Sequence, residues 1–206
     1  MPLNRMDDLT DDVRIQVPSA IDQYIQNAIE RCTLQFCHDT WAYQNTYYRN
    51  ADEGIQEYLI VPENEDTLIA IQGVEYRGKA LAPVRPTQVP SGRIGTPMGW
   101  SYTPTNMVQI YPAPDRFGPQ ALEFRLVLAP AKNFLPDVLF TQHHRGLLTG
   151  AMAWLYAMPE QRWTSPQLAM EYKREHASHV REAKRRQLFE YAPRNHTMRS
   201  GGGLWP

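Results

Sequence analysis

Histidines are the side chains whose spacing in this sequence comes nearest to a chemical site. Six are present: His38, His143, His144, His176, His179 and His196. His176 and His179 are three residues apart, which places both imidazoles on one face of a helix, as a metal site requires. His176 also continues an apolar stripe, however, and no His-Glu-x-x-His pattern or third ligand lies at a diagnostic spacing. We therefore expect packing histidines here, with no metal and no cofactor.

Nucleophiles and phosphate-binding loops are equally hard to find. The sequence has no Gly-x-Ser-x-Gly elbow, and Cys37 next to His38 lacks the context of a thiolate catalyst. Cys32 fits a buried stripe, and on a helix the thiols of Cys32 and Cys37 point about 140° apart, so we expect no disulfide between them. The glycines at 92 and 95 and at 201–203 do not open a helix that could receive a phosphate. We expect no enzymatic activity and no catalytic residue.

Composition describes one soluble domain whose charge is unevenly distributed. The 206 residues carry a net charge of -1. No stretch approaches the ~20 apolar residues of a membrane helix, and the N-terminus lacks a signal-peptide core, so an intracellular protein is expected. Residues 1–66 hold 13 acidic and 4 basic side chains, whereas residues 171–199 hold 8 basic and 4 acidic ones. These complementary ends favour head-to-tail self-assembly.

Three long helices are predicted by apolar residues at helical spacing. The first covers about residues 19–40, with Ser19 as N-cap and Asp22 in the first turn. The second covers 138–158 after an N-cap at Asp137, and the third covers about 167–191 after Pro166. The third helix carries Lys184, Arg185 and Arg186 on a face that we expect to contact solvent first and a neighbouring subunit or DNA second.

The middle of the chain is predicted to be an antiparallel sheet, because short segments rich in β-branched and aromatic residues alternate with turn residues. These segments are residues 41–49, 56–61, 67–74, 107–111 and 121–128. Prolines make residues 83–104 a long extended loop. The predicted fold is α+β: a small bundle of mainly three long helices with this antiparallel β-sheet, at about 41–130, inserted between the first and second. Residues 1–192 form one domain, and 193–206 form a flexible C-terminal arm.

The arm ends in Leu204, Trp205 and Pro206 after a glycine-rich spacer that includes Arg194 and Arg199. One interpretation is an inert disordered end. The other is an anchor, in which the glycines give reach and the two large apolar groups enter a pocket on a partner. We favour the anchor, because tryptophan is an uncommon choice for an inert end.

The order of these elements resembles that of the head-to-tail adaptor (connector) proteins of tailed bacteriophages. The resemblance covers roughly residues 12–192. It rests on four motifs in order: Val17-Pro18, Phe36-Cys37-His38-Asp39-Thr40-Trp41, Leu128-Ala-Pro-Ala with Leu135-Pro136-Asp137, and residues 150–159 with Trp163. The histidines of the last two helices depart from the family pattern.

The resemblance implies a structural virion protein at the neck of the particle, made in the bacterial cytoplasm. Family members form a ring, typically of twelve copies, that lies beneath the portal protein, continues the DNA channel without sequence-specific binding and contacts a tail or nozzle protein. C-terminal arms that reach the portal would place Arg194, Arg199, Leu204, Trp205 and Pro206 in portal docking. No membrane contact and no catalytic residue are implied.

Two other functions stay open. A nucleic-acid-associated protein would use Lys184, Arg185 and Arg186, although the near-zero net charge argues against a dedicated nucleic-acid binder. A metal-dependent hydrolase centred on His176 and His179 is a more distant alternative.

Overall fold

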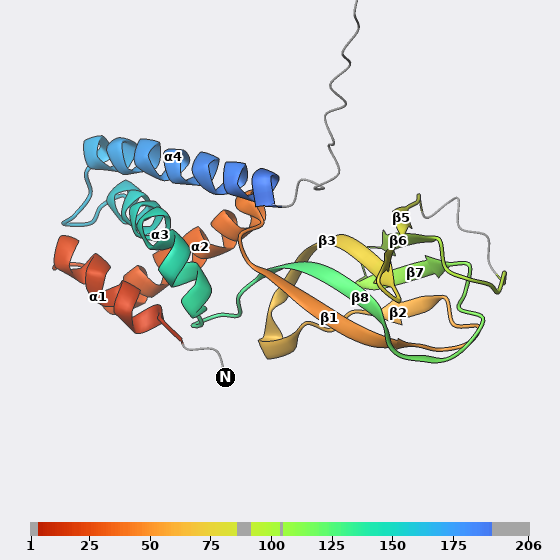
Figure 1. Cartoon of the computed structure of the whole chain (residues 1–206). Helices are drawn as coiled ribbons and strands as arrows, with labels where there is room; N and C mark the ends of the chain where they lie inside the picture. The colour runs from red at the N-terminus through yellow and green to blue at the C-terminus, as the bar shows by residue number, and fades with distance from the viewer. Residues whose placement is uncertain (1–3, 86–91, 104, 191–206) are drawn as a thin grey trace, which may run out of the picture.

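Helices and strands occupy separate halves of the computed structural model, which describes residues 4–85, 92–103 and 105–190 (Figure 1). The helical half contains α1 (Met6–Gln16), α2 (Asp22–Thr40), α3 (Asp137–Ala157) and α4 (Pro166–Glu190). Figure 1 shows α1 and α4 on opposite sides of the bundle, with α2 and α3 between them. None of these helices combines the length and apolar character needed to cross a bilayer, among the residues described.

The β half consists of two four-stranded sheets. The first has the order β1 (Gln44–Ala51), β8 (Gly118–Ala129), β3 (Thr67–Tyr76), β4 (Lys79–Ala80) and is antiparallel throughout. The second has the order β2 (Glu57–Leu59), β7 (Met107–Tyr111), β6 (Gly99–Thr103), β5 (Ala82–Pro83), and only its β5–β6 pair is parallel. A short 3₁₀ helix, η1 (Glu63–Glu65), links β2 to β3. The chain therefore passes from one sheet to the other several times.

One hydrophobic core runs through both halves. Phe36 of α2, Leu147 of α3 and Phe124 of β8 are completely buried members of it. Burial of each such side chain contributes about 2 kcal/mol. The halves are joined at Asp66, whose carboxylate accepts hydrogen bonds from the Tyr43 hydroxyl (2.9 Å) and the Ala131 amide (3.1 Å). Burial raises the pKa of Asp66 despite these two donors.

The predicted architecture of three long helices with one inserted sheet is wrong. The described residues form four helices and two sheets of four strands each. The missed helix, α1, is short and rich in aspartate, and its apolar residues Leu9 and Val13 are stabilised by burial in the core, which a local sequence pattern does not show. Alternation of apolar and polar residues predicts a strand but does not show which other strand it pairs with. The division of the strands into two sheets was therefore not expected.

Several boundaries differ from the prediction as well. The N-cap of α2 is Ile21 rather than Ser19, and the N-cap of α3 is Pro136, with Asp137 in the first turn. Within the segment predicted to be a loop, residues 99–103 form β6, and β5 ends at Pro83. The start of α4 at Pro166 is confirmed. The predicted arm, residues 193–206, lies outside the described residues.

Candidate functional site

The basic residues predicted to contact a neighbour lie near the C-terminal end of α4. Lys184, Arg185 and Arg186 are all exposed, while Ala183 just before them is buried. Because successive residues of a helix are about 100° apart, these three side chains point in different directions. Lys184 borders Trp41 and Gln72 at the junction with the β half, whereas Arg186 donates to Glu182 (2.6 Å) and borders the histidines of α3. The structure therefore separates the three cations.

The exposed surface of α4 is nevertheless basic towards its C-terminal end: residues 166–180 hold two basic and two acidic side chains, whereas residues 181–186 hold four basic and one acidic. Apart from Arg186, the helix has five exposed cations, and none of them takes part in an ion pair within the described residues. They are Lys173, Arg174, Arg181, Lys184 and Arg185. Its inward surface carries the partly buried Tyr172 and Val180, which pack on the core. The charge is therefore displayed to solvent and is available to an acidic surface.

Acidic residues gather on α1, on the opposite side of the bundle. This helix carries four aspartates at positions that alternate with its buried residues. The aspartates are Asp7, Asp8, Asp11 and Asp12, and the buried residues are Met6, Leu9, Thr10 and Val13. Some of this charge is compensated locally: Arg5 contacts Asp8 at 2.9 Å, and Arg14 contacts Asp11 at 2.5 Å. Asp7 is exposed and lacks an ion-pair partner in the part of the chain described. The helical half thus has an acidic side and a basic side.

Four histidines meet where α1, α2 and α4 pack around α3. Nε2 of His144 lies 2.7 Å from an Asp12 carboxylate oxygen, and the ring of His143 packs on Phe36, with centroids 5.0 Å apart. Nδ1 of His176 lies 2.8 Å from the Gly146 carbonyl oxygen. No group of three possible metal ligands occurs among the described residues. The histidines therefore have contacts with neighbouring helices that account for their positions.

Two glycines of α3 allow the three larger helices to approach closely. A β-carbon at Gly146 would lie 3.1 Å from the Cβ of His179 and 3.2 Å from the Phe36 ring. At Gly150 it would collide with the Sγ of Cys32 and lie 2.7 Å from Nδ1 of His176. Cys32 and Cys37 are free and buried, and burial raises the pKa of Cys32 to about 12. Cys32 thus acts as a small core residue, which is the structural role expected for it.

Acidification is expected to destabilise the bundle through His143. Burial lowers the pKa of His143 below its ordinary value of 6.5, and Arg186 of α4 acts in the same direction, whereas Glu182 opposes it. Between the lowered native pKa and 6.5, the unfolded chain binds a proton that the native chain does not bind, so the free energy of unfolding falls as the pH drops below 6.5. Phe36 of α2 and His179 of α4 also border this site.

The measurement is a series of urea denaturation curves between about pH 7.5 and 5.5. His143→Gln should flatten the pH dependence, because the substituted side chain cannot take up the proton. His38→Gln, at an exposed position, is the matched control and should keep the wild-type slope. Equal slopes for His143→Gln and the wild type would contradict this assignment.

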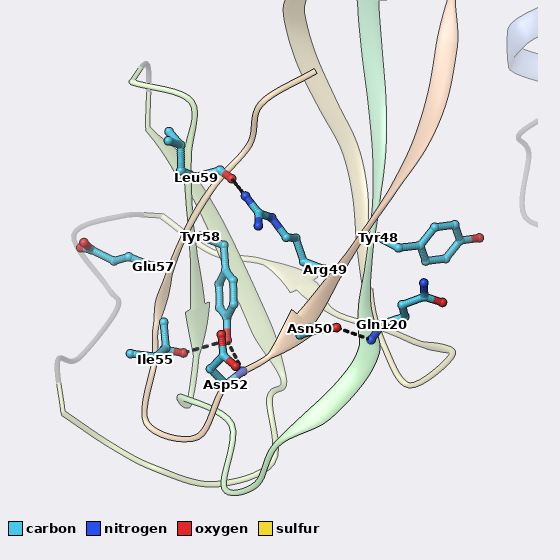
Figure 2. Close-up of a pocket in the computed structure, with 9 residues that line it drawn as sticks. All are labelled: Tyr48, Arg49, Asn50, Asp52, Ile55, Glu57, Tyr58, Leu59 and Gln120. Atoms are coloured by element: carbon cyan, nitrogen blue, oxygen red, sulfur yellow. Dashed lines mark hydrogen bonds between the residues drawn. The ribbon is translucent and has the colours of Figure 1, made fainter. Parts of the chain in front are cut away.

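A second candidate site is a groove of about 470 Å³ between β1 and β2. Figure 2 shows the Arg49 side chain crossing from β1 towards β2, where it donates to the Leu59 carbonyl oxygen (3.4 Å). At another point of the groove, the Tyr58 hydroxyl donates to the Ile55 carbonyl oxygen and accepts from the Asp52 amide, at 3.2 Å in each case. No sequence pattern indicated this groove, because it forms where the consecutive strands β1 and β2 enter different sheets.

The arm residues predicted for portal docking lie outside the described residues: Arg194, Arg199, Leu204, Trp205 and Pro206. Among the residues described, the structure thus brings none of the predicted site residues together into one cluster. The acidic surface of α1 was signalled in the sequence by four aspartates within six residues, although the helix itself was not predicted.

The comparisons with known proteins give no family. No family model matches this chain, and the search of curated proteins gives no match either.

Proposed function

We propose that this protein is a structural virion protein, a head-to-tail adaptor that forms a ring between the portal and the tail of a bacteriophage. The observation that carries the proposal is the placement of the acidic helix α1 and the basic helix α4 on opposite sides of the bundle (Figure 1). A surface that complements another surface of the same chain makes a heterologous contact, and such contacts close into rings when the rotation between copies allows it.

The charge arrangement suits this kind of contact. The acidic side of one copy attracts the basic side of the next, and two copies meeting through the same side repel each other. That discrimination favours head-to-tail over two-fold pairing. The motif order described above supplies the biological setting, in which the ring lies under the portal protein, continues the DNA channel and contacts a tail or nozzle protein.

The nucleic-acid alternative has weaker support. Lys184, Arg185 and Arg186 diverge around α4, and Arg186 is paired with Glu182, so they do not form one stripe along which a phosphate backbone could run. Binding of short duplex DNA at low salt, with an affinity that falls steeply as salt rises, would support that alternative instead.

The predicted portal anchor is tested by truncation. Removal of residues 201–206 is expected to weaken capture by immobilised portal protein by about tenfold or more, because an aromatic anchor in a pocket contributes ~2 kcal/mol or more to binding. The matched control replaces the same six residues by a Gly-Ser segment of equal length, which should bind as weakly as the truncated chain. Capture equal to that of the wild type, with an unchanged melting temperature, would contradict the anchor.

A further inference from the structure

The β half is as polarised in charge as the helical half. Residues 51–75 contain seven acidic and no basic side chains, whereas residues 76–114 contain four basic and no acidic ones. The first segment includes β2, η1 and β3, and the second begins just before β4 and β5. β1 and β2, which line one groove, are edge strands of the two sheets, and β4 and β5, separated only by Leu81, are the edge strands at the other ends. The segments do not follow the edges completely, since Glu75 faces Ala80 of β4. Asp52, Glu53 and Glu57 nevertheless lie beside β1 and β2, and Lys79 and Arg85 lie at β4 and β5.

The β1–β2 edge is acidic. Asp52 and Glu57 line the groove drawn in Figure 2, and Glu53 follows Asp52 in the chain; all three are exposed, and none belongs to an ion pair within the described residues. Two of the cations on this side have local partners: Arg49 donates to the Leu59 carbonyl oxygen, and Arg93 donates to the Tyr111 hydroxyl (3.2 Å). The exposed Arg116, in the loop whose Pro114 carbonyl oxygen accepts from the Gly54 amide, is preceded by the exposed Asp115. The edge therefore keeps an excess of negative charge.

This edge also presents backbone groups that the fold does not pair in a sheet. The Leu128 amide donates to the Tyr43 carbonyl oxygen, and Asn45 and Tyr47 face Leu126 and Phe124. The odd-numbered residues thus pair with β8, so the amide and carbonyl groups of Thr46 and Tyr48 point away from the sheet, where the Thr46 amide donates to the Asn45 Oδ1 (2.8 Å). Neither lysine nor proline protects this eight-residue edge strand.

Apolar side chains border the same groove. Tyr48, Ile55 and Leu59 are 52%, 46% and 49% exposed. An edge strand with half-exposed apolar side chains is favourable for contact with another chain, because association removes these side chains from water.

The opposite edge has the complementary properties. Lys79 of β4 and Arg85 just after β5 are exposed and make no ion pair in the described part of the chain. Ala80, Ala82 and Pro83 between them are exposed, small and apolar. A surface of small side chains flanked by two cations can approach a groove closely and place its charges against carboxylates.

We propose that the β1–β2 edge of one copy binds the β4–β5 edge of the next copy. Asp52, Glu53 and Glu57 then face Lys79 and Arg85, and the small residues of β4 and β5 cover Tyr48, Ile55 and Leu59. The contact is heterologous, because its two surfaces lie at opposite ends of the same sheets. This edge contact rests on the proposed function in one respect, because it extends the head-to-tail contact proposed for the helical half into the β half.

Cross-linking tests this contact. A variant carrying both Glu57→Cys and Lys79→Cys is treated with a short bis-maleimide under the conditions in which the wild type associates. A ladder of cross-linked multimers is expected, because each copy offers one thiol to each neighbour. Either single variant should give at least about tenfold less cross-linked product. A single variant can link only identical positions of two copies, and identical positions lie close together only in a two-fold symmetric contact. Cys32 and Cys37 are buried and free, so the wild type is the background control.

Charge reversal supplies a second test that does not depend on cysteine chemistry. Lys79→Glu with Arg85→Glu should weaken self-association by about tenfold or more, and adding Asp52→Lys with Glu57→Lys should restore it, because opposite charges face each other again. The matched control is Lys132→Glu with Arg162→Glu, which makes the same change in net charge at exposed positions away from both edges.

The outcomes separate this contact from the ring. The edge contact is contradicted, and the ring is not, if the wild type forms rings, the double-cysteine variant gives no cross-linked ladder, and Lys79→Glu with Arg85→Glu behaves like the control variant. A ladder in particles that never close into a ring supports the edge contact and contradicts the proposed function. Absence of both ladder and association contradicts both proposals.

Discussion

Replacing Gly150 by alanine is expected to lower the free energy of unfolding by about 3 kcal/mol, at the upper end of the cost of overpacking a core. The added β-carbon would collide with Cys32 of α2 and lie 2.7 Å from Nδ1 of His176 on α4. Both neighbours are held by other contacts, since Cys32 is buried and His176 is hydrogen-bonded to Gly146. Because α2, α3 and α4 meet at this point, none of them can move without disturbing the others.

Urea denaturation followed by circular dichroism measures this effect. Gly73→Ala is the matched control: a β-carbon there has no neighbour within 4 Å, so its cost should be small. Combining Gly150→Ala with Cys32→Ala should recover part of the loss, because one of the two colliding groups is removed. A Gly150→Ala protein as stable as the wild type would contradict the close approach of the three helices.

Reversing two charges on α4 is expected to have the largest effect on assembly. Arg181→Glu with Arg185→Glu, four residues apart on one face of the helix, should weaken self-association by about a hundredfold, because like charges then face each other across a contact that depends on opposite ones. Both residues are exposed and make no ion pair within the described residues, so the stability of the monomer should change little. Analytical ultracentrifugation over a range of concentrations measures the change.

Rescue identifies the partner surface. Asp7→Lys with Asp11→Lys places two cations on the same face of α1, four residues apart, and should restore the association of the α4 variant. The control Lys132→Glu with Arg162→Glu changes net charge equally at exposed sites elsewhere. If this control weakens association as much as the α4 reversal, the effect is one of net charge, and the assignment of α4 as an interface is contradicted.

The elements that sequence analysis predicted well are those with strong local signals. Pro166 opens α4, and β7 covers residues 107–111 as predicted, because proline and alternating apolar residues act within a few positions. The elements it missed depend on distant partners. The two-residue strand β5 exists because it pairs with β6, about seventeen positions later, and α1 is stabilised by burial of Leu9 and Val13.

The candidate sites divide in the same way. The basic composition of α4 is visible in the sequence, but the divergence of Lys184, Arg185 and Arg186 follows from the helix and from their neighbours in three dimensions. The opposition of α1 and α4 also needs the tertiary structure, because it requires the packing of α2 and α3 between them. The acidic and basic edges of the β half depend on which strands end each sheet, and the sequence does not determine that order.

The most direct test of the adaptor proposal is the mass and symmetry of the particle that the full chain forms in solution, alone and with its portal protein. Native mass spectrometry gives the number of 23.8 kDa copies, and electron-microscopy class averages give the rotational symmetry. The proposal predicts a closed ring of identical copies, on its own or on addition of portal, that dissociates as salt screens the opposed charges. A strict monomer under both conditions would contradict it.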